Sequence, residues 1–234
     1  MSRRLATLLL LSGGLLYANW LFQLVLPVHL SPLTSYVSEL SALSHPYHQA
    51  FRAMDIVSGL AVIAGAACGM SVGRRDRAAA TVWIALALFG MSNILDALTP
   101  LDCTLTVRAA CNASTTPDVW RWIGDPHMYA SLGEEVFFVV ALVALVISLR
   151  AAHAPIAVRR FAEVLGYVTV CTSIIAGMLT ADLNFFRQDM LLGLVQRAEV
   201  LFMALWVALV PRVLITPELR PTQRAPGHTH LAAR

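Results

Sequence analysis

Residues 127–149 read HMYASLGEEVFFVVALVALVISL, and this stretch decides the fold class. From position 136 to position 149 every residue except Ser148 is apolar. The stretch has the length of roughly 20 residues that an α-helix needs to cross the hydrocarbon core of a bilayer. Because lipid offers the backbone no hydrogen-bond partners, a spanning segment must satisfy its N–H and C=O groups internally, so a transmembrane α-helix is predicted here.

The composition of the whole chain agrees with a membrane environment. Of its 234 residues, 58% are hydrophobic and 13% are charged, against about 25% charged residues in soluble domains. The mean hydropathy is +0.68, and a soluble domain of this size could not cover so much apolar surface. The net charge is only +3 and the chain has no basic run, which argues against a nucleic-acid partner and leaves membrane lipids as the expected one.

Five further stretches have the same character, so the sequence predicts an all-α fold, an integral membrane bundle of six transmembrane helices. Residues 1–216 form the predicted transmembrane domain. The Pro- and Arg-rich residues 217–234 are predicted to be a disordered cytoplasmic tail. The six predicted spans are 5–27, 51–72, 79–98, 127–149, 161–182 and 193–215.

Most arginines lie in the connections on one side of these spans. Cytoplasmic connections of membrane proteins carry an excess of basic residues, so the sequence predicts a multi-pass protein of the bacterial inner membrane with both termini in the cytoplasm. An even number of spans agrees with this topology. The arginines on the predicted cytoplasmic side are Arg3, Arg4, Arg74, Arg75, Arg77, Arg150, Arg159, Arg160, Arg212, Arg220, Arg224 and Arg234.

Polar residues within the spans concentrate toward the outward ends, where each is a candidate for function because such groups are costly in a bilayer. His127, Ser131 and Glu134 share one face of their predicted helix. Glu134 lies about 10 Å below His127 along the helix axis. It needs a partner, and Arg197 is the expected one, with an Asp96–Arg197 pair as the alternative. The predicted outward-facing ligand pocket comprises Asp55, Asp96, His127, Ser131, Glu134 and Arg197.

The same region contains residue types that catalysis would need. His127 and nearby aspartates offer imidazole and carboxylate ligands to zinc, and an open coordination position would activate water. The sequence has no HxxxH or HExxH spacing, so His127 is the one candidate metal ligand. Ser38, His127 and an aspartate would supply the nucleophile, base and acid of a serine hydrolase. The candidate catalytic residues are His127, Asp102, Asp96, Asp55 and Ser38.

The first predicted outer loop, residues 28–50, is rich in Ser and His. Its Tyr36, Leu40 and Leu43 have the spacing of an apolar stripe on a helix. We therefore expect a short helix that lies in the membrane interface.

The second predicted outer loop contains two cysteines, Cys103 and Cys111. An oxidising exterior compartment favours a disulfide between them. Their spacing is not the CxxC of redox centres, so the predicted disulfide is structural and would stiffen the loop over the helix ends.

Three segments resemble a known family. They are residues 35–43 (SYVSELSAL), residues 98–102 (LTPLD) with His127 after a Thr-containing loop, and residues 193–197 (GLVQR) before a helix with Trp206. Together they are similar to the bacterial membrane proteins grouped as domain of unknown function 998, over nearly all six predicted spans. The resemblance implies a six-helix membrane bundle and no established activity. The loop before His127 departs from the family in its length and its two cysteines, which leaves its geometry open. The positions that match the family are Ser38, Pro100, Asp102, His127 and Arg197.

Three classes of function stay open. The first is a membrane protein that binds or handles a lipid or small amphiphile in an outward-facing polar pocket, which the outward carboxylates and the interfacial loop favour. The second is a membrane-embedded hydrolase or transferase, metal-dependent or not, which requires His127, Asp102 and one further aspartate to lie close together. The third is a structural or partner-binding subunit, in which every charge is paired and no cavity remains.

Overall fold

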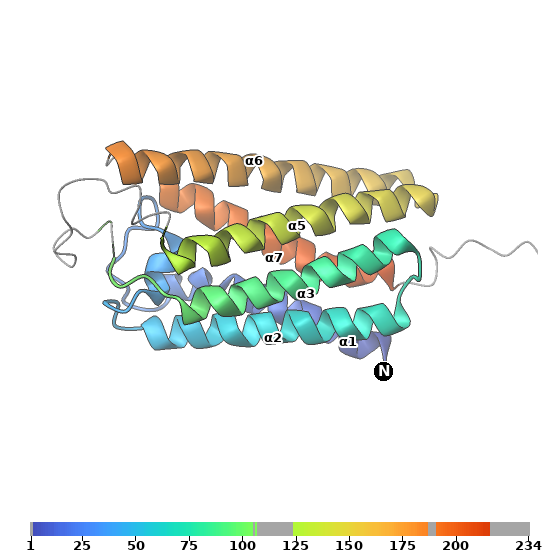
Figure 1. Ribbon diagram of the computed structural model, residues 1–234, viewed down its shortest axis with the longest axis horizontal. Helices are drawn as coiled ribbons and strands as arrows, with labels where there is room; N and C mark the ends of the chain where they lie inside the picture. The colour runs from blue at the N-terminus through green and yellow to red at the C-terminus, as the bar shows by residue number, and fades with distance from the viewer. Residues whose placement is uncertain (1, 105, 107–123, 187–190, 216–234) are drawn as a thin grey trace, which may run out of the picture.

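The computed structural model describes residues 2–104, 106, 124–186 and 191–215. Within these ranges the chain forms helices and their connections, with no strand, which confirms the predicted all-α fold. Long helices run side by side in one elongated bundle (Figure 1). The predicted tail, residues 217–234, lies outside the described residues. The elements are α1 (Arg3–Tyr17), the 3₁₀-helices η1 (Asn19–Leu24) and η2 (Val37–Ser41), α2 (His48–Val72), α3 (Arg77–Leu98), α5 (Pro126–Ala151), α6 (Ile156–Phe186) and α7 (Leu192–Leu214).

Five of these helices, α2, α3, α5, α6 and α7, are long and apolar enough to cross a membrane. Their bounds lie close to the predicted spans, because long apolar runs leave the backbone in lipid no alternative to helix. The five helices together indicate a polytopic membrane protein.

The first predicted span, residues 5–27, consists of two helices. α1 ends at Tyr17, and the chain continues as η1. The 15 residues of α1 extend about 22 Å at 1.5 Å per residue, which is less than a hydrocarbon core of about 30 Å. The six-span count therefore stays a prediction, and so does the cytoplasmic position of both termini.

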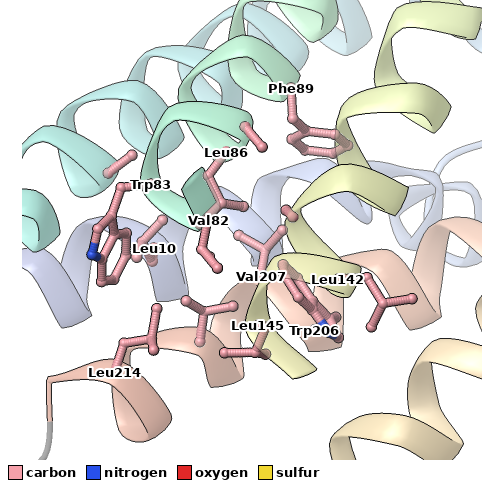
Figure 2. Close-up of a cluster of buried hydrophobic side chains, with 14 of the residues drawn as sticks. Leu10, Val82, Trp83, Leu86, Phe89, Leu142, Leu145, Trp206, Val207 and Leu214 are labelled. Atoms are coloured by element: carbon pink, nitrogen blue, oxygen red, sulfur yellow. The ribbon is translucent and has the colours of Figure 1, made fainter. Parts of the chain in front are cut away.

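The first and last described helices, α1 and α7, pack against each other. In addition, α2 packs between α1 and α3, α3 packs against α5, and α6 packs against α7. Figure 2 shows buried side chains of different helices meeting in the core, among them Leu10 of α1, Trp83 of α3 and Leu145 of α5. The Trp206 ring of α7 meets the Phe138 ring edge-on, with centroids 5.1 Å apart. This core fixes the helices that carry the polar residues described below.

A pair of glycines brings α2 and α3 close together. A Cβ atom on Gly59 would overlap the carbonyl oxygen of Gly90, and a Cβ atom on Gly90 would lie 2.7 Å from the carbonyl oxygen of Gly59. Small residues allow such close backbone approach in membrane bundles. Since Gly59 follows Asp55 by one helical turn, this contact also sets the spacing of α2 and α3 beside the polar site.

Asp76 starts α3 at the arginine-rich end of the bundle. Its carboxylate accepts hydrogen bonds from the Ala79 N–H at 2.9 Å, from Arg74 at 2.9 Å and from the Ser148 hydroxyl of α5 at 3.2 Å. Burial raises the pKa of Asp76, but these hydrogen bonds and the charge of Arg74 outweigh burial, so the pKa lies below its usual value. The ionised carboxylate therefore stabilises the turn between α2 and α3.

The loop between η1 and α2 folds against the bundle. The short helix expected there is the 3₁₀-helix η2, preceded by the buried Tyr36. Leu40 is also buried, in a cluster with Leu30 and Phe51, whereas Leu43 is exposed. The prediction that Tyr36 and Leu40 face the membrane interface is therefore wrong, because these side chains pack on the protein itself.

His45 is buried in the same loop. Its ring centroid lies 5.9 Å from that of Tyr47 and 6.1 Å from that of Phe51. Burial lowers the pKa of His45; a hydrogen bond with the backbone of Leu40 opposes this effect, and neighbouring histidines add to it. The folded loop therefore favours the neutral imidazole.

Candidate functional site

Five carboxyl groups lie in a row across the bundle, at the end where η1 and η2 are found. Asp55 of α2 interacts electrostatically with Asp96 of α3, and both interact with Glu134 of α5. Next to Glu134, Glu135 interacts in turn with Glu199 of α7. We call these five residues the carboxyl row. It joins four helices that are separate in the sequence.

Tyr17 holds Glu134 at the centre of the row. The Tyr17 hydroxyl donates a hydrogen bond to Oε2 of Glu134 at 2.6 Å, and both side chains are buried. The Tyr17 ring packs edge-on against Phe89, with centroids 5.0 Å apart. Since the tyrosine is the last residue of α1, the bond also fixes the point where α1 gives way to η1.

Asp55 is held by Asn19, which begins η1. The Asn19 amide donates to Oδ1 of Asp55 at 2.5 Å. One turn deeper in α2, Ser58 donates to the carbonyl oxygen of Gly13 at 2.9 Å and accepts from the Asn93 amide at 3.2 Å. Polar side chains therefore link α1, α2 and α3 just below the row.

Asp96 contacts both His127 and Ser131 of α5. Ser131 donates to Oδ1 of Asp96 at 2.7 Å, and Nδ1 of His127 lies 3.1 Å from the same oxygen. The imidazole contact is an ion pair when the ring is protonated, although Nδ1 does not have hydrogen-bond geometry. Asp125 places the histidine, because its carboxylate accepts from the His127 N–H at 3.0 Å and caps α5.

The far end of the row lies between α5, α6 and α7. Glu135 and Glu199 interact electrostatically with each other, and the Ser173 hydroxyl of α6 lies beside both. Oε2 of Glu135 and Oγ of Ser173 are buried without a hydrogen bond to another described residue. At this end of the row, an added donor group would find an unbonded carboxyl oxygen.

Arg197 does not pair with the row. Its guanidinium donates to Oε1 of Gln23 at 2.7 Å, to the carbonyl oxygen of Ser35 at 2.8 Å and to that of Gly193 at 2.9 Å. The predicted Glu134–Arg197 pair and its Asp96–Arg197 alternative are therefore wrong. Arg197 is directed to the loop before α2, and Tyr17 takes the place that the prediction gave it beside Glu134.

Arg197 interacts electrostatically with Glu39 of η2, which is fully buried. Glu39 accepts from the Thr106 N–H at 2.6 Å and from its hydroxyl at 2.5 Å, and the Ser35 and Thr106 hydroxyls lie 2.8 Å apart. Arg197 and Glu39 together fasten the loop before α2 to α7 and to the segment after α3.

Other predicted site residues lie apart from the row. Asp102 is exposed, and within the described ranges no contact joins Asp102 or the Ser38 side chain to His127. Cys111 lies outside the described residues, so the disulfide with Cys103 stays a prediction. The described part of the chain contains no group of three or more His, Cys, Asp or Glu side chains that could hold a metal ion. The zinc hypothesis therefore rests on His127 and Asp96.

Comparison with known protein families identifies the family of this chain. A family model described as protein of unknown function (DUF998) matches residues 10–212. The chain belongs to the DUF998 family. No curated protein and no solved structure matches it.

In this DUF998 protein the structure links five of the six residues that the sequence predicted for a pocket, Asp55, Asp96, His127, Ser131 and Glu134. No role was predicted for Tyr17 and Asn19, which hold two of those carboxyl groups. The sequence could have indicated both residues, because they are polar side chains inside the apolar stretch 5–27, where each needs a hydrogen-bond partner. Which helix supplies that partner depends on packing, which the sequence does not contain.

Proposed function

We propose that this DUF998 protein binds a lipid or small amphiphile that carries a positively charged group, and that the carboxyl row holds that group. The observation that carries the proposal is the excess of acidic over basic side chains in the row. Within the described residues, the row takes part in one ion pair, between Asp96 and His127. The other nearby cations bind elsewhere, since Arg197 bonds Gln23 and Ser35, and Arg52 donates to the carbonyl oxygen of Ala97 at 2.7 Å.

Carboxylates removed from water need a cation, a proton or several hydrogen bonds. Tyr17 and Asn19 give Glu134 and Asp55 one hydrogen bond each. Oε2 of Glu135 is buried and has no hydrogen-bond partner among the described residues. An ammonium group at the Glu135–Glu199 end would therefore satisfy atoms that the protein leaves unsatisfied.

The apolar part of such a ligand would lie against the helix surfaces that face lipid. On the helix that carries Glu135, Leu132 and Val136 are exposed apolar side chains within one turn of that residue. A polar headgroup site bordered by apolar surface is the usual form of a site for an amphiphile. We further propose that this end faces outward in the bacterial inner membrane, with both termini in the cytoplasm, as the arginine distribution predicts.

The test uses two amphiphiles of equal chain length, dodecylammonium, whose N–H groups can donate hydrogen bonds, and neutral dodecyl maltoside, with the purified full chain. We expect the cationic amphiphile to raise the thermal midpoint in the wild type. One charge-assisted hydrogen bond contributes roughly 1.5–3 kcal/mol, so Glu135→Gln and Glu199→Gln should each weaken its binding about 10- to 100-fold. Glu163→Gln is the matched control, because Glu163 pairs with Arg150 at the opposite end. Equal binding of both amphiphiles, or equal loss in the control, contradicts the proposal.

A second candidate rests on His127 and Asp96, which are 3.1 Å apart, and it leaves out Asp102, which the sequence-based hypothesis required. A carboxylate beside an imidazole orients a general base, as in hydrolases. Ser131 donates to Asp96, so the nucleophile of a membrane-embedded hydrolase or transferase would be water or a substrate hydroxyl, activated by zinc if the pair binds it. Metal analysis of the purified protein separates the candidates: stoichiometric zinc that His127→Gln abolishes favours catalysis. A purely structural row would show neither zinc nor selective amphiphile binding, and only stability would fall in the row variants.

A further inference from the structure

A groove of about 390 Å³ lies between α1 and α7, at the end of the bundle opposite to the carboxyl row. The N-terminal end of α1 and the C-terminal end of α7 lie at this same end (Figure 1). Three arginines and three larger apolar side chains line the groove: Arg3, Arg4, Arg212, Leu8, Pro211 and Ile215. It combines concentrated positive charge with apolar walls.

The described acidic side chains at this end are engaged elsewhere. Asp76 pairs with Arg74 at 2.9 Å, and Glu163 pairs with Arg150 at 2.7 Å. Neither lines the groove. Arg212 also has a partner of its own, as a guanidinium with five N–H groups can. The N-terminal end of α1 adds the partial positive charge of a helix dipole.

An apolar stripe leads from the groove along α1. Arg4, Leu8, Leu11 and Leu15 follow one another at the helical spacing of three or four residues and therefore lie on one face. Leu8, Leu11 and Leu15 are exposed large apolar side chains, and Leu15 is 70% exposed. In a helix that lies in a bilayer, this stripe faces acyl chains and starts at the arginine that would hold a headgroup.

We infer that this groove binds an anionic phospholipid. The phosphate lies among Arg3, Arg4 and Arg212, and an acyl chain follows the stripe of α1. Guanidinium groups bind phosphate oxygens through paired N–H donors, and basic pockets between transmembrane helices are known to bind anionic lipid headgroups. The site is separate from the carboxyl row and has the opposite charge.

The test compares two triple variants of the full chain that lose the same charge at the same end. One replaces the groove arginines, Arg3→Gln/Arg4→Gln/Arg212→Gln. The other replaces arginines of the connections that do not line the groove, Arg75→Gln/Arg77→Gln/Arg160→Gln. Each protein is exposed to equal amounts of phosphatidylglycerol and phosphatidylcholine in detergent, and bound lipid is counted by native mass spectrometry.

We expect wild type and connection variant to retain phosphatidylglycerol in preference to phosphatidylcholine. Each basic residue near an anionic lipid contributes roughly a five-fold factor in affinity, so the groove variant should bind phosphatidylglycerol about 100-fold more weakly. A variant with lysine at the three groove positions should recover most of this binding, which separates loss of charge from misfolding.

Three results would overturn the inference. They are equal phosphatidylglycerol retention in the two triple variants, the absence of any preference over phosphatidylcholine, and displacement of the lipid by excess inorganic phosphate. The last result would show that the groove recognises free phosphate. Failure of wild type to take up either lipid is one form of the second result, and it would favour the segment after Ile215 as the occupant of the groove.

Discussion

Replacing Tyr17 with phenylalanine removes one atom from the centre of the carboxyl row. The lost hydroxyl donates to Glu134 at 2.6 Å and also lies 3.6 Å from the sulfur of Met203. The ring and its edge-on contact with Phe89 are preserved. The substitution therefore tests the hydrogen bond with little change in packing.

Two considerations set the size of the effect. A hydrogen bond to a charged group in a soluble protein contributes about 1.5–3 kcal/mol. Interhelical hydrogen bonds within membranes contribute less, about 0.6 kcal/mol on average and about 1.7 kcal/mol at most. Because Tyr17 and Glu134 are both buried, we expect a coupling near the upper end of the membrane range, about 1–2 kcal/mol.

The assay is a double-mutant cycle of Tyr17→Phe and Glu134→Ala, which removes the acceptor, measured as the free energy of unfolding in detergent. Each single variant and the double variant should lose stability, and the double variant less than the sum of the two. The cycle isolates the pair from the separate cost of leaving Glu134 without its donor.

Tyr167→Phe provides the control, because Tyr167 is 69% exposed and its hydroxyl makes no hydrogen bond to a described residue. It should stay within about 0.5 kcal/mol of wild type. A coupling energy near zero between Tyr17 and Glu134, or an equal loss in the Tyr167 variant, would refute the reasoning that this bond orders the row.

Three further perturbations have defined outcomes in thermal or chemical unfolding. Gly59→Ala forces a Cβ atom onto the Gly90 carbonyl oxygen and should cost about 1–3 kcal/mol. Asp76→Ala removes the cap of α3 and should cost about 1 kcal/mol. Because the pKa of Asp76 is lowered in the folded protein, the wild type should keep this stabilisation above about pH 4. It should lose the stabilisation as the pH falls through the folded pKa. His45 also has a lowered folded pKa, so stability should begin to fall as the pH drops below about 6.5, and His45→Gln should remove that dependence.

Each of these predictions has an outcome that contradicts it. A Cβ atom on Gly177 would have no neighbour within 4 Å, so Gly177→Ala should be neutral. If Gly59→Ala and Gly177→Ala cost the same stability, the cost comes from lost backbone freedom and not from the close approach of α2 and α3. An Asp76→Ala variant as sensitive to acid as wild type would assign the acid transition to other groups. Stability of wild type that is unchanged between neutral pH and the folded pKa of His45 would show that the loop around His45 does not unfold with the bundle.

The sequence predicted the long helices well because one physical constraint dominates them. An apolar run of spanning length, such as residues 127–149, can satisfy its backbone only as a helix, and α5 covers all of it. The end of α1 was not predicted, because residues 5–27 are apolar on both sides of the break. That break coincides with Tyr17 and Asn19, whose partners lie on α5 and α2, so it depends on tertiary contacts.

In the candidate site, too, the sequence predicts what depends on residue spacing and misses what depends on tertiary contacts. The depth of Glu134 in its helix could be read from residue spacing, and so could its need for a partner. The identity of the partner could not, because Tyr17 reaches Glu134 only where α1 and α5 meet. Arg197, the partner that the sequence predicted, instead donates to the carbonyl oxygens of Ser35 and Gly193. Charge and depth therefore predict that a partner exists, whereas helix packing decides which one.

The bonds of Arg197 also have a consequence for the order of membrane insertion. Gln23 and Ser35 precede α2, whereas Arg197 lies on α7, the last described helix. During synthesis the loop before α2 is therefore made well before Arg197, and the two can bond only after most of the polypeptide has left the ribosome. Until then Gln23 and the Ser35 carbonyl group lack their native donor, so nascent chains that stop before α7 should be preferred substrates of quality-control proteases.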